Sequence, residues 1–141
     1  MAVTASSIRA GLATAVNTIS GVIPATGYLL SEPTPPTFEI EPAGIEYNQA
    51  HANGVNEWTF TVRGFVGTAS DLVSQQSLDV WMAASGTGSV KAAIESDLTL
   101  GGVVSSLQVV RVSAPRTFAV SSQPNSLYLG AEWTVRILAT A

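Results

Sequence analysis

His51 is the only histidine in the 141-residue sequence, and the sequence contains no cysteine. Cysteine–histidine pairs and metal sites with several histidines are therefore impossible. A Ser/His/Asp triad could form only around His51, which lies beside the turn dipeptide Asn53-Gly54, and no Gly-x-Ser-x-Gly elbow accompanies it. An exposed loop histidine is the favoured interpretation, and we predict no metal ion and no other cofactor.

Two glutamates, Glu39 and Glu41, lie two residues apart on a segment that reads as a strand, and Glu46 is close in the sequence. Side chains two apart on a strand point to the same face, so paired carboxylates could do acid/base work if burial separated their pKa values. The surrounding sequence supplies no apolar pocket. We therefore predict solvated carboxylates, and a small hydrolase is the remote alternative.

The segment from Gly86 to Lys91 (GTGSVK) superficially resembles a phosphate-binding loop. A dinucleotide fingerprint requires a preceding strand and a third glycine, and a P-loop requires Gly-Lys-Ser/Thr. This segment instead joins two predicted helices. Its glycines and Ser89 are suited to ending one helix and capping the next, so we predict a connector.

Charged residues are scarce, because Asp, Glu, Lys and Arg make up 11% of the chain, whereas globular domains average about 25%. Much of the surface must be Ser, Thr, Gly, Ala and aliphatic, which favours a permanent partner over a monomer coated with Ser and Thr. Six basic against ten acidic residues argue against nucleic-acid binding. A hydrophobic content of 46% excludes intrinsic disorder.

The length predicts a single domain that spans residues 1–141. The partly apolar stretch Ala5–Ile19 contains Arg9 and several polar residues, which does not fit a secretory signal. No window approaches the ~20 apolar residues that cross a bilayer. We expect a soluble, intracellular protein without a membrane partner.

Hydrophobic periodicity predicts helices and strands in the order α, β, β, β, α, α, β, β. The predicted helices are Ala5–Ile19, Ser70 to about Ala84, and Val90 to Asp97. The predicted strands are Tyr28–Leu30, Phe38–Glu41 with a continuation at Ile45–Tyr47, Glu57–Val66 with a bulge or bend at Gly64, Gly102–Val112, and Tyr128–Leu138. The segment Pro115–Ser126 is predicted to be a loop.

Turns rather than helices separate most of the strands, which predicts an α+β fold. We expect a two-layer sandwich: a mostly antiparallel sheet of about five strands, with the helices packed on one face. The predicted core consists of Ile8, Leu12, Val16, Trp58, Phe60, Val62, Trp81, Trp133, Val135 and Ile137. The repeated Glu-Trp-Thr at Glu57 and Glu132 indicates two similar, neighbouring strands whose Glu and Arg residues share the exposed face.

Four segments distributed along the chain carry a family resemblance: Leu30–Pro36 (LSEPTPP), Glu57–Val62 (EWTFTV), Ser85–Gly102 (SGTGSVKAAIESDLTLGG) and Leu129–Arg136 (LGAEWTVR). Together they resemble the tail terminator proteins of long, flexible-tailed phages, especially those that infect actinobacteria. The likeness extends over nearly the whole length and is weakest between Pro115 and Leu127. It implies a small α+β virion protein that forms a ring, usually six-fold, on the head-proximal end of the tail tube.

The resemblance implies that such a ring ends tube polymerisation and offers a docking surface to the head. The implied partners are further copies of the chain, the tail tube protein and the head–tail connector or stopper, in the neck of a virion assembled in the host cytoplasm. Another neck ring or a tail tube subunit is the alternative, and tube subunits normally carry long hairpins.

The loops Ala43–Val55 and Pro115–Ser126 are the longest predicted non-helical connections, and we expect them to order against a partner. The candidate contact residues are Glu46, His51, Asn53, Arg116 and Asn125.

Overall fold

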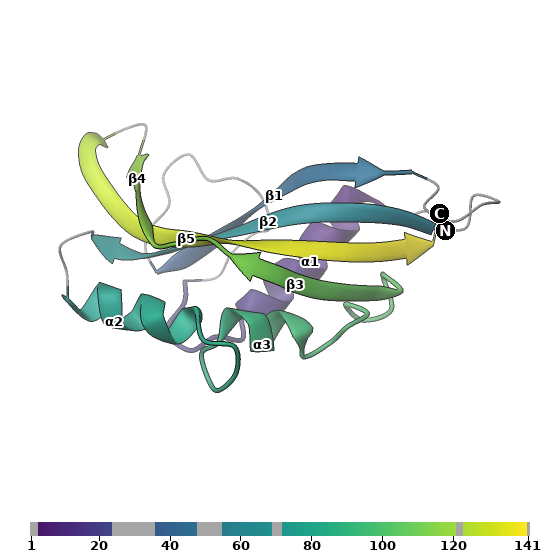
Figure 1. Ribbon diagram of the computed structural model, residues 1–141, viewed down its shortest axis with the longest axis horizontal. Coiled ribbons are helices and arrows are strands. Elements are labelled where there is room, and N and C mark those ends of the chain that lie inside the picture. The colour runs from purple at the N-terminus through teal and green to yellow at the C-terminus, as the bar shows by residue number, and fades with distance from the viewer. Residues whose placement is uncertain (1–2, 24–35, 48–54, 69–71, 121–122, 141) are drawn as a thin grey trace.

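A computed structural model describes residues 3–23, 36–47, 55–68, 72–120 and 123–140. In this part of the chain, three helices lie against one face of a five-stranded antiparallel sheet (Figure 1). The predicted two-layer α+β sandwich is therefore confirmed. The predicted strand Tyr28–Leu30 lies outside the described residues.

The first helix, α1 (Ala5–Val16), begins with a reciprocal cap. The Thr4 hydroxyl accepts a hydrogen bond of 3.2 Å from the backbone N–H of Ser7, and the Ser7 hydroxyl accepts one of 3.2 Å from the backbone N–H of Thr4. The helix buries Ile8, Leu12 and Val16 against the sheet, as predicted. It ends at Val16 rather than Ile19.

The other two helices, α2 (Leu72–Trp81) and α3 (Val90–Glu95), are joined by the glycine-containing segment. The Ser89 hydroxyl accepts a hydrogen bond of 3.1 Å from the Ala92 N–H and donates one of 2.6 Å to the Ala83 carbonyl. Ser89 thereby caps α3 and fastens it to the segment after α2, which confirms the predicted connector.

The strands β1 (Thr37–Glu46), β2 (Val55–Thr68), β5 (Gln123–Thr140) and β3 (Ser106–Val112) lie side by side in that order. The short strand β4 (Arg116–Val120) also pairs with β5. The predicted neighbourhood of the two Glu-Trp-Thr strands is confirmed, because β2 and β5 pair along most of their lengths.

The prediction that Pro115–Ser126 forms a loop is wrong. Residues 116–120 pair with residues 123–130 of β5, and this hairpin curves away from the helices (Figure 1). The Phe118 ring packs edge-on against Phe65 of β2, with centroids 5.4 Å apart, and Phe65 in turn contacts Tyr128 at 6.3 Å. The contact with Phe118 that stabilises β4 comes from Phe65, which is distant in the sequence. The local composition of residues 115–126 therefore did not predict a strand.

The predicted core is buried with one exception: Trp58 is only partly buried and packs at the margin of the core. Phe38, absent from the predicted core, is fully buried and stacks on Trp81 with ring centroids 4.5 Å apart. Gly64 makes room for this stack, because a Cβ there would lie 2.7 Å from the Phe38 ring. The bulge or bend predicted at Gly64 occurs slightly later in the strand, because the register between β2 and β5 shifts between Phe65 and Gly67.

Candidate functional site

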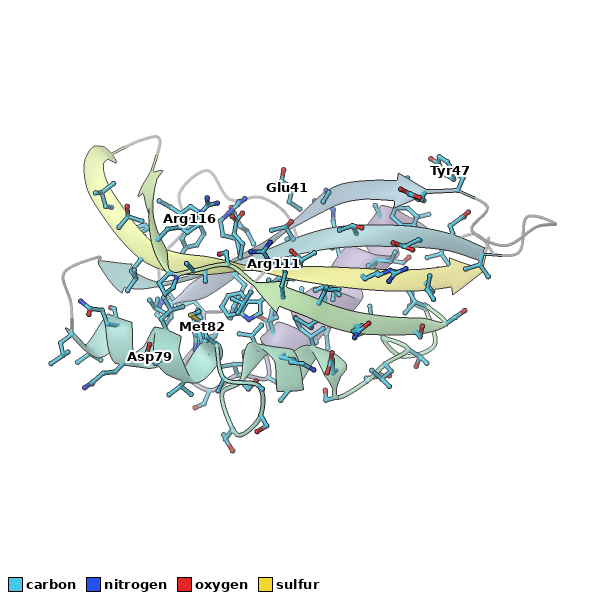
Figure 2. All side chains as sticks on the ribbon, in the orientation of Figure 1. Glu41, Tyr47, Asp79, Met82, Arg111 and Arg116 are labelled. Atoms are coloured by element: carbon cyan, nitrogen blue, oxygen red, sulfur yellow. The ribbon has the colours of Figure 1, made fainter. Side chains whose placement is uncertain are left out.

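The sheet face opposite the helices carries most of the charged side chains in the described part of the chain. The alternation of strand side chains turns Phe60 and Val62 toward the helices and the intervening residues away from them. Figure 2 shows Glu41 and Arg116 on this open side of the sheet. The charged residues of the open face are Glu39, Glu41, Glu46, Glu57, Arg63, Arg111, Arg116, Glu132 and Arg136.

Arg63 lies at the centre of an ionic cluster that joins four strands. Its guanidinium donates to Glu39 of β1, to Glu41 Oε2 at 3.3 Å and to Glu132 Oε2 of β5 at 2.7 Å. Arg116 of β4 binds the other oxygen of Glu132. We call these five residues the Arg63 cluster. They link residues of β1, β2, β4 and β5.

The Arg63 cluster is partly removed from water. The side chains of Arg63 and Glu39 are 19% and 8% exposed. Burial lowers the pKa of Arg63, but hydrogen bonds to Glu132 and Glu39 outweigh that effect and raise the pKa above its ordinary value. The Phe118 ring lies near both cations, with its centroid 5.5 Å from Arg63 Cζ and 4.8 Å from Arg116 Cζ.

The prediction that Glu39 is solvated is therefore wrong. Its carboxylate is buried because Arg63, from the neighbouring strand, supplies the opposite charge there. Both Glu39 and Glu41 accept hydrogen bonds from the same guanidinium. This arrangement is more typical of carboxylates held in place by an ion pair than of a carboxylate pair that exchanges protons with a substrate.

The opposite end of the open face contains a second ion pair. Arg136 Nη2 of β5 lies 2.8 Å from Glu57 Oε2 of β2. The bond to Glu57, with a smaller contribution from Glu46, raises the pKa of Arg136. Glu46 of β1 lies opposite Glu57 of β2, and Arg136 of β5 lies on the other side of β2.

Between the two ionic regions, the open face is polar and only shallowly hollowed. Thr59, Thr61 and Thr134 occupy its middle and are partly buried. A depression of about 220 Å³ is lined by Thr61, Arg111, Ser113, Glu132 and Thr134. In the described part of the chain, no group of three or more His, Cys, Asp or Glu side chains is arranged to hold a metal ion.

Helix α2 differs from the ionic centre of the open face because it exposes several aliphatic side chains. Leu72 and Val73 of α2 are each 65% exposed, and Val80, on the same helix, is 49% exposed. Asp79 is the acidic residue of α2. The molecule thus presents an ionic sheet face and a weakly charged, partly apolar helix.

The candidate contact residues lie at separate places. Glu46 ends β1 and is exposed, Arg116 belongs to β4 and the Arg63 cluster, and Asn125 falls within β5. His51 and Asn53 lie outside the described residues. The prediction that Arg116 lies on a docking loop is wrong, because pairing with Gly130 and the bond to Glu132 hold it in a strand.

Sequence reasoning did not identify Arg63 as the centre of the charged face. The available signal was the repeated Glu-Trp-Thr, with an arginine shortly after each copy, at Arg63 and Arg136. In antiparallel pairing these arginines meet glutamates of the opposite strand.

No protein-family model matches this chain, and no curated protein matches its sequence. Among the helices that the structure describes, none has the length and apolar character needed to span a membrane.

Proposed function

We propose that this protein is a ring-forming subunit that caps the head-proximal end of a phage tail tube. The ring ends tube polymerisation and offers the surface on which the head connector docks. The proposal begins from the four segments that resemble tail terminator proteins. Two of them, Glu57–Val62 and Leu129–Arg136, lie in the adjacent strands β2 and β5.

The observation that best supports the proposal is the difference in surface character between the two layers of the fold. Monomeric proteins rarely leave apolar helix surface in water, so the exposed aliphatic side chains of α2 favour contact with another protein. The open sheet face offers a different, ionic surface. Two unlike surfaces are what a ring requires, because head-to-tail contacts join different patches of identical subunits.

In the proposed ring, lateral surfaces meet neighbouring copies, most simply in a hexamer. The two axial surfaces meet the tail tube protein and the connector or stopper protein. The protein would then reside in the neck of the virion after assembly in the host cytoplasm. This role requires neither a cofactor nor catalytic residues.

A tail tube subunit, or a subunit of another neck ring, is the second candidate. One observation favours it: the β4–β5 hairpin curves away from the helix layer, as an element that reaches a neighbour would (Figure 1). The two roles differ in copy number, because a tube consists of many stacked rings whereas a terminator forms one.

The proposal is tested by removing the gene from the phage that encodes the chain and imaging lysates by electron microscopy. We expect tail tubes of uncontrolled length and filled heads without tails, with both defects corrected by the wild-type gene supplied in trans. Tails of normal length joined to heads in the absence of the protein would overturn the proposal. Loss of all tubes would favour the tube subunit instead.

A further inference from the structure

Asp79 and Arg111 are two exposed charged side chains that make no hydrogen bond or ion pair within the described part of the chain. The other charged side chains described there are engaged by carboxylates, by cations or by polar groups. Figure 2 labels Asp79 on α2 and Arg111 beside β3. Within the residues that the structure describes, Asp79 and Arg111 are therefore an acid and a base without a polar partner, and they lie on different elements.

Asp79 lies within an aliphatic surface on α2. Leu72 precedes it by two helical turns on the same side of the helix, and the exposed Val73 and Val80 are also seven residues apart. We call Leu72, Val73, Asp79 and Val80 the α2 patch. It combines apolar area with a single negative charge.

Arg111 lies beside an exposed aliphatic side chain on β3. The register between β3 and β5 shifts between Val109 and Arg111, and Val110, the extra residue, is 53% exposed. Arg111 lies opposite Thr134 and lines the shallow depression of the open face. We call Val110 and Arg111 the β3 patch. It combines apolar area with a single positive charge.

We propose that the α2 patch of one copy docks on the β3 patch of the next copy, with Asp79 facing Arg111. The inference rests on the proposed ring and names its lateral contact. The two patches are complementary in charge and alike in apolar character, and one belongs to the helix layer while the other lies on the sheet. A head-to-tail contact between identical chains neutralises both charges, and repetition of that contact generates a ring.

Pairing of the β1 or β3 edge between copies is a less suitable contact because each of these two edge strands is obstructed. In β1, Pro42 lacks an N–H group and the register shifts between Pro42 and Gly44. In β3, the Glu95 carboxylate accepts a hydrogen bond of 2.9 Å from the Val109 N–H. Such features discourage the addition of a strand at the edges of β1 and β3, which favours a contact between side-chain surfaces.

Charge reversal tests the contact. We expect Asp79→Arg alone and Arg111→Asp alone each to weaken self-association at least about tenfold, because each places like charges together. An equimolar mixture of the two variants restores association, since alternating copies pair opposite charges at every contact. Sedimentation velocity over a range of concentrations measures this. Thr14→Arg, at an exposed position on α1, is the control for added charge and leaves association unchanged.

Cross-linking provides the second readout, because the wild-type chain contains no cysteine. A short bismaleimide should link Asp79→Cys to Arg111→Cys in a mixture, whereas neither variant should give dimers alone. Normal association of both charge-reversal variants would overturn the contact while leaving the proposed ring standing. The contact would also be overturned if the mixture were not linked and the wild type stayed monomeric. The proposed ring is tested separately, by imaging phage from which the gene has been deleted.

Discussion

Arg63 and Glu132 lie directly opposite each other on β2 and β5, although 69 residues separate them in the sequence. The Arg63 guanidinium donates two hydrogen bonds to Glu132 Oε2, of 3.0 and 2.7 Å. The same guanidinium binds Glu39 of β1. One cation therefore ties three adjacent strands together on the open face.

Loss of this cation should destabilise the fold. Arg63→Met leaves the buried Glu39 carboxylate without its cation, and we expect a decrease of about 3 kcal/mol in the free energy of unfolding. Glu41→Gln is the control, because Glu41 is 45% exposed and an exposed ion pair contributes about 1 kcal/mol or less. Urea unfolding followed by tryptophan fluorescence measures both. Equal losses in the two variants would contradict the assigned burial.

The close approach of β5 to β2 requires a glycine at position 130. A Cβ at Gly130 would lie 2.1 Å from the carbonyl oxygen of Gly64, which is backbone and cannot rotate away. We expect Gly130→Ala to cost about 3 kcal/mol of unfolding free energy. Gly44→Ala is the matched control, since nothing lies within 4 Å of a Cβ there. Thermal unfolding of both variants measures the difference, and similar melting temperatures would contradict this close packing of the two strands.

The two sheet tryptophans should differ in their contribution to stability. Trp133 is 1% exposed, so Trp133→Ala should lower the free energy of unfolding by about 3–5 kcal/mol. Trp58 packs at the margin of the core, and Trp58→Ala should cost less. Urea denaturation of the two variants ranks them, and the opposite order would show that the assigned core is wrong.

Acid should weaken the attachment of α3 to the sheet edge through Glu95. Burial raises the pKa of Glu95, but hydrogen bonds from Lys91 and the Val109 N–H outweigh it and lower the pKa below 4.5. A carboxylate with a lowered folded-state pKa stabilises the fold above its unfolded pKa, and this stability is lost as pH falls through the folded pKa.

The Glu95→Gln variant isolates that contribution. We expect wild type to be more stable than the variant at neutral pH and the difference to shrink as pH falls below 4.5, the ordinary value for glutamate. Urea midpoints of the two proteins over this pH range provide the measurement. A difference that stays constant with pH would mean that ionised Glu95 does not support this contact.

Local sequence pattern was sufficient for the elements whose burial repeats with a regular period. The alternation of Trp58, Phe60 and Val62 predicted β2, and the Glu-Trp-Thr repeat predicted its pairing with β5. Helix α1 followed from the spacing of Ile8 and Leu12.

Features that depend on partners distant in the sequence were not predicted correctly. Strand β4 is stabilised by the contact between Phe118 and Phe65, and the burial of Glu39 depends on Arg63 across a strand pair. Arg116 was expected on a loop because its partner, Glu132, comes from the following strand. The sequence predicted that Glu and Arg residues of β2 and β5 share the exposed face, but the cluster around Arg63, which includes Glu39 and Arg116, became recognisable only when the strands were aligned.

The position and copy number of this protein in the intact particle test the proposed function most directly. Electron cryomicroscopy of the neck should show a single ring, of six copies in its simplest form, between the last ring of tube subunits and the connector. Copies repeated along the tube would identify a tube subunit instead. Absence of the protein from the neck, or its presence there as an isolated monomer, would contradict the proposed ring.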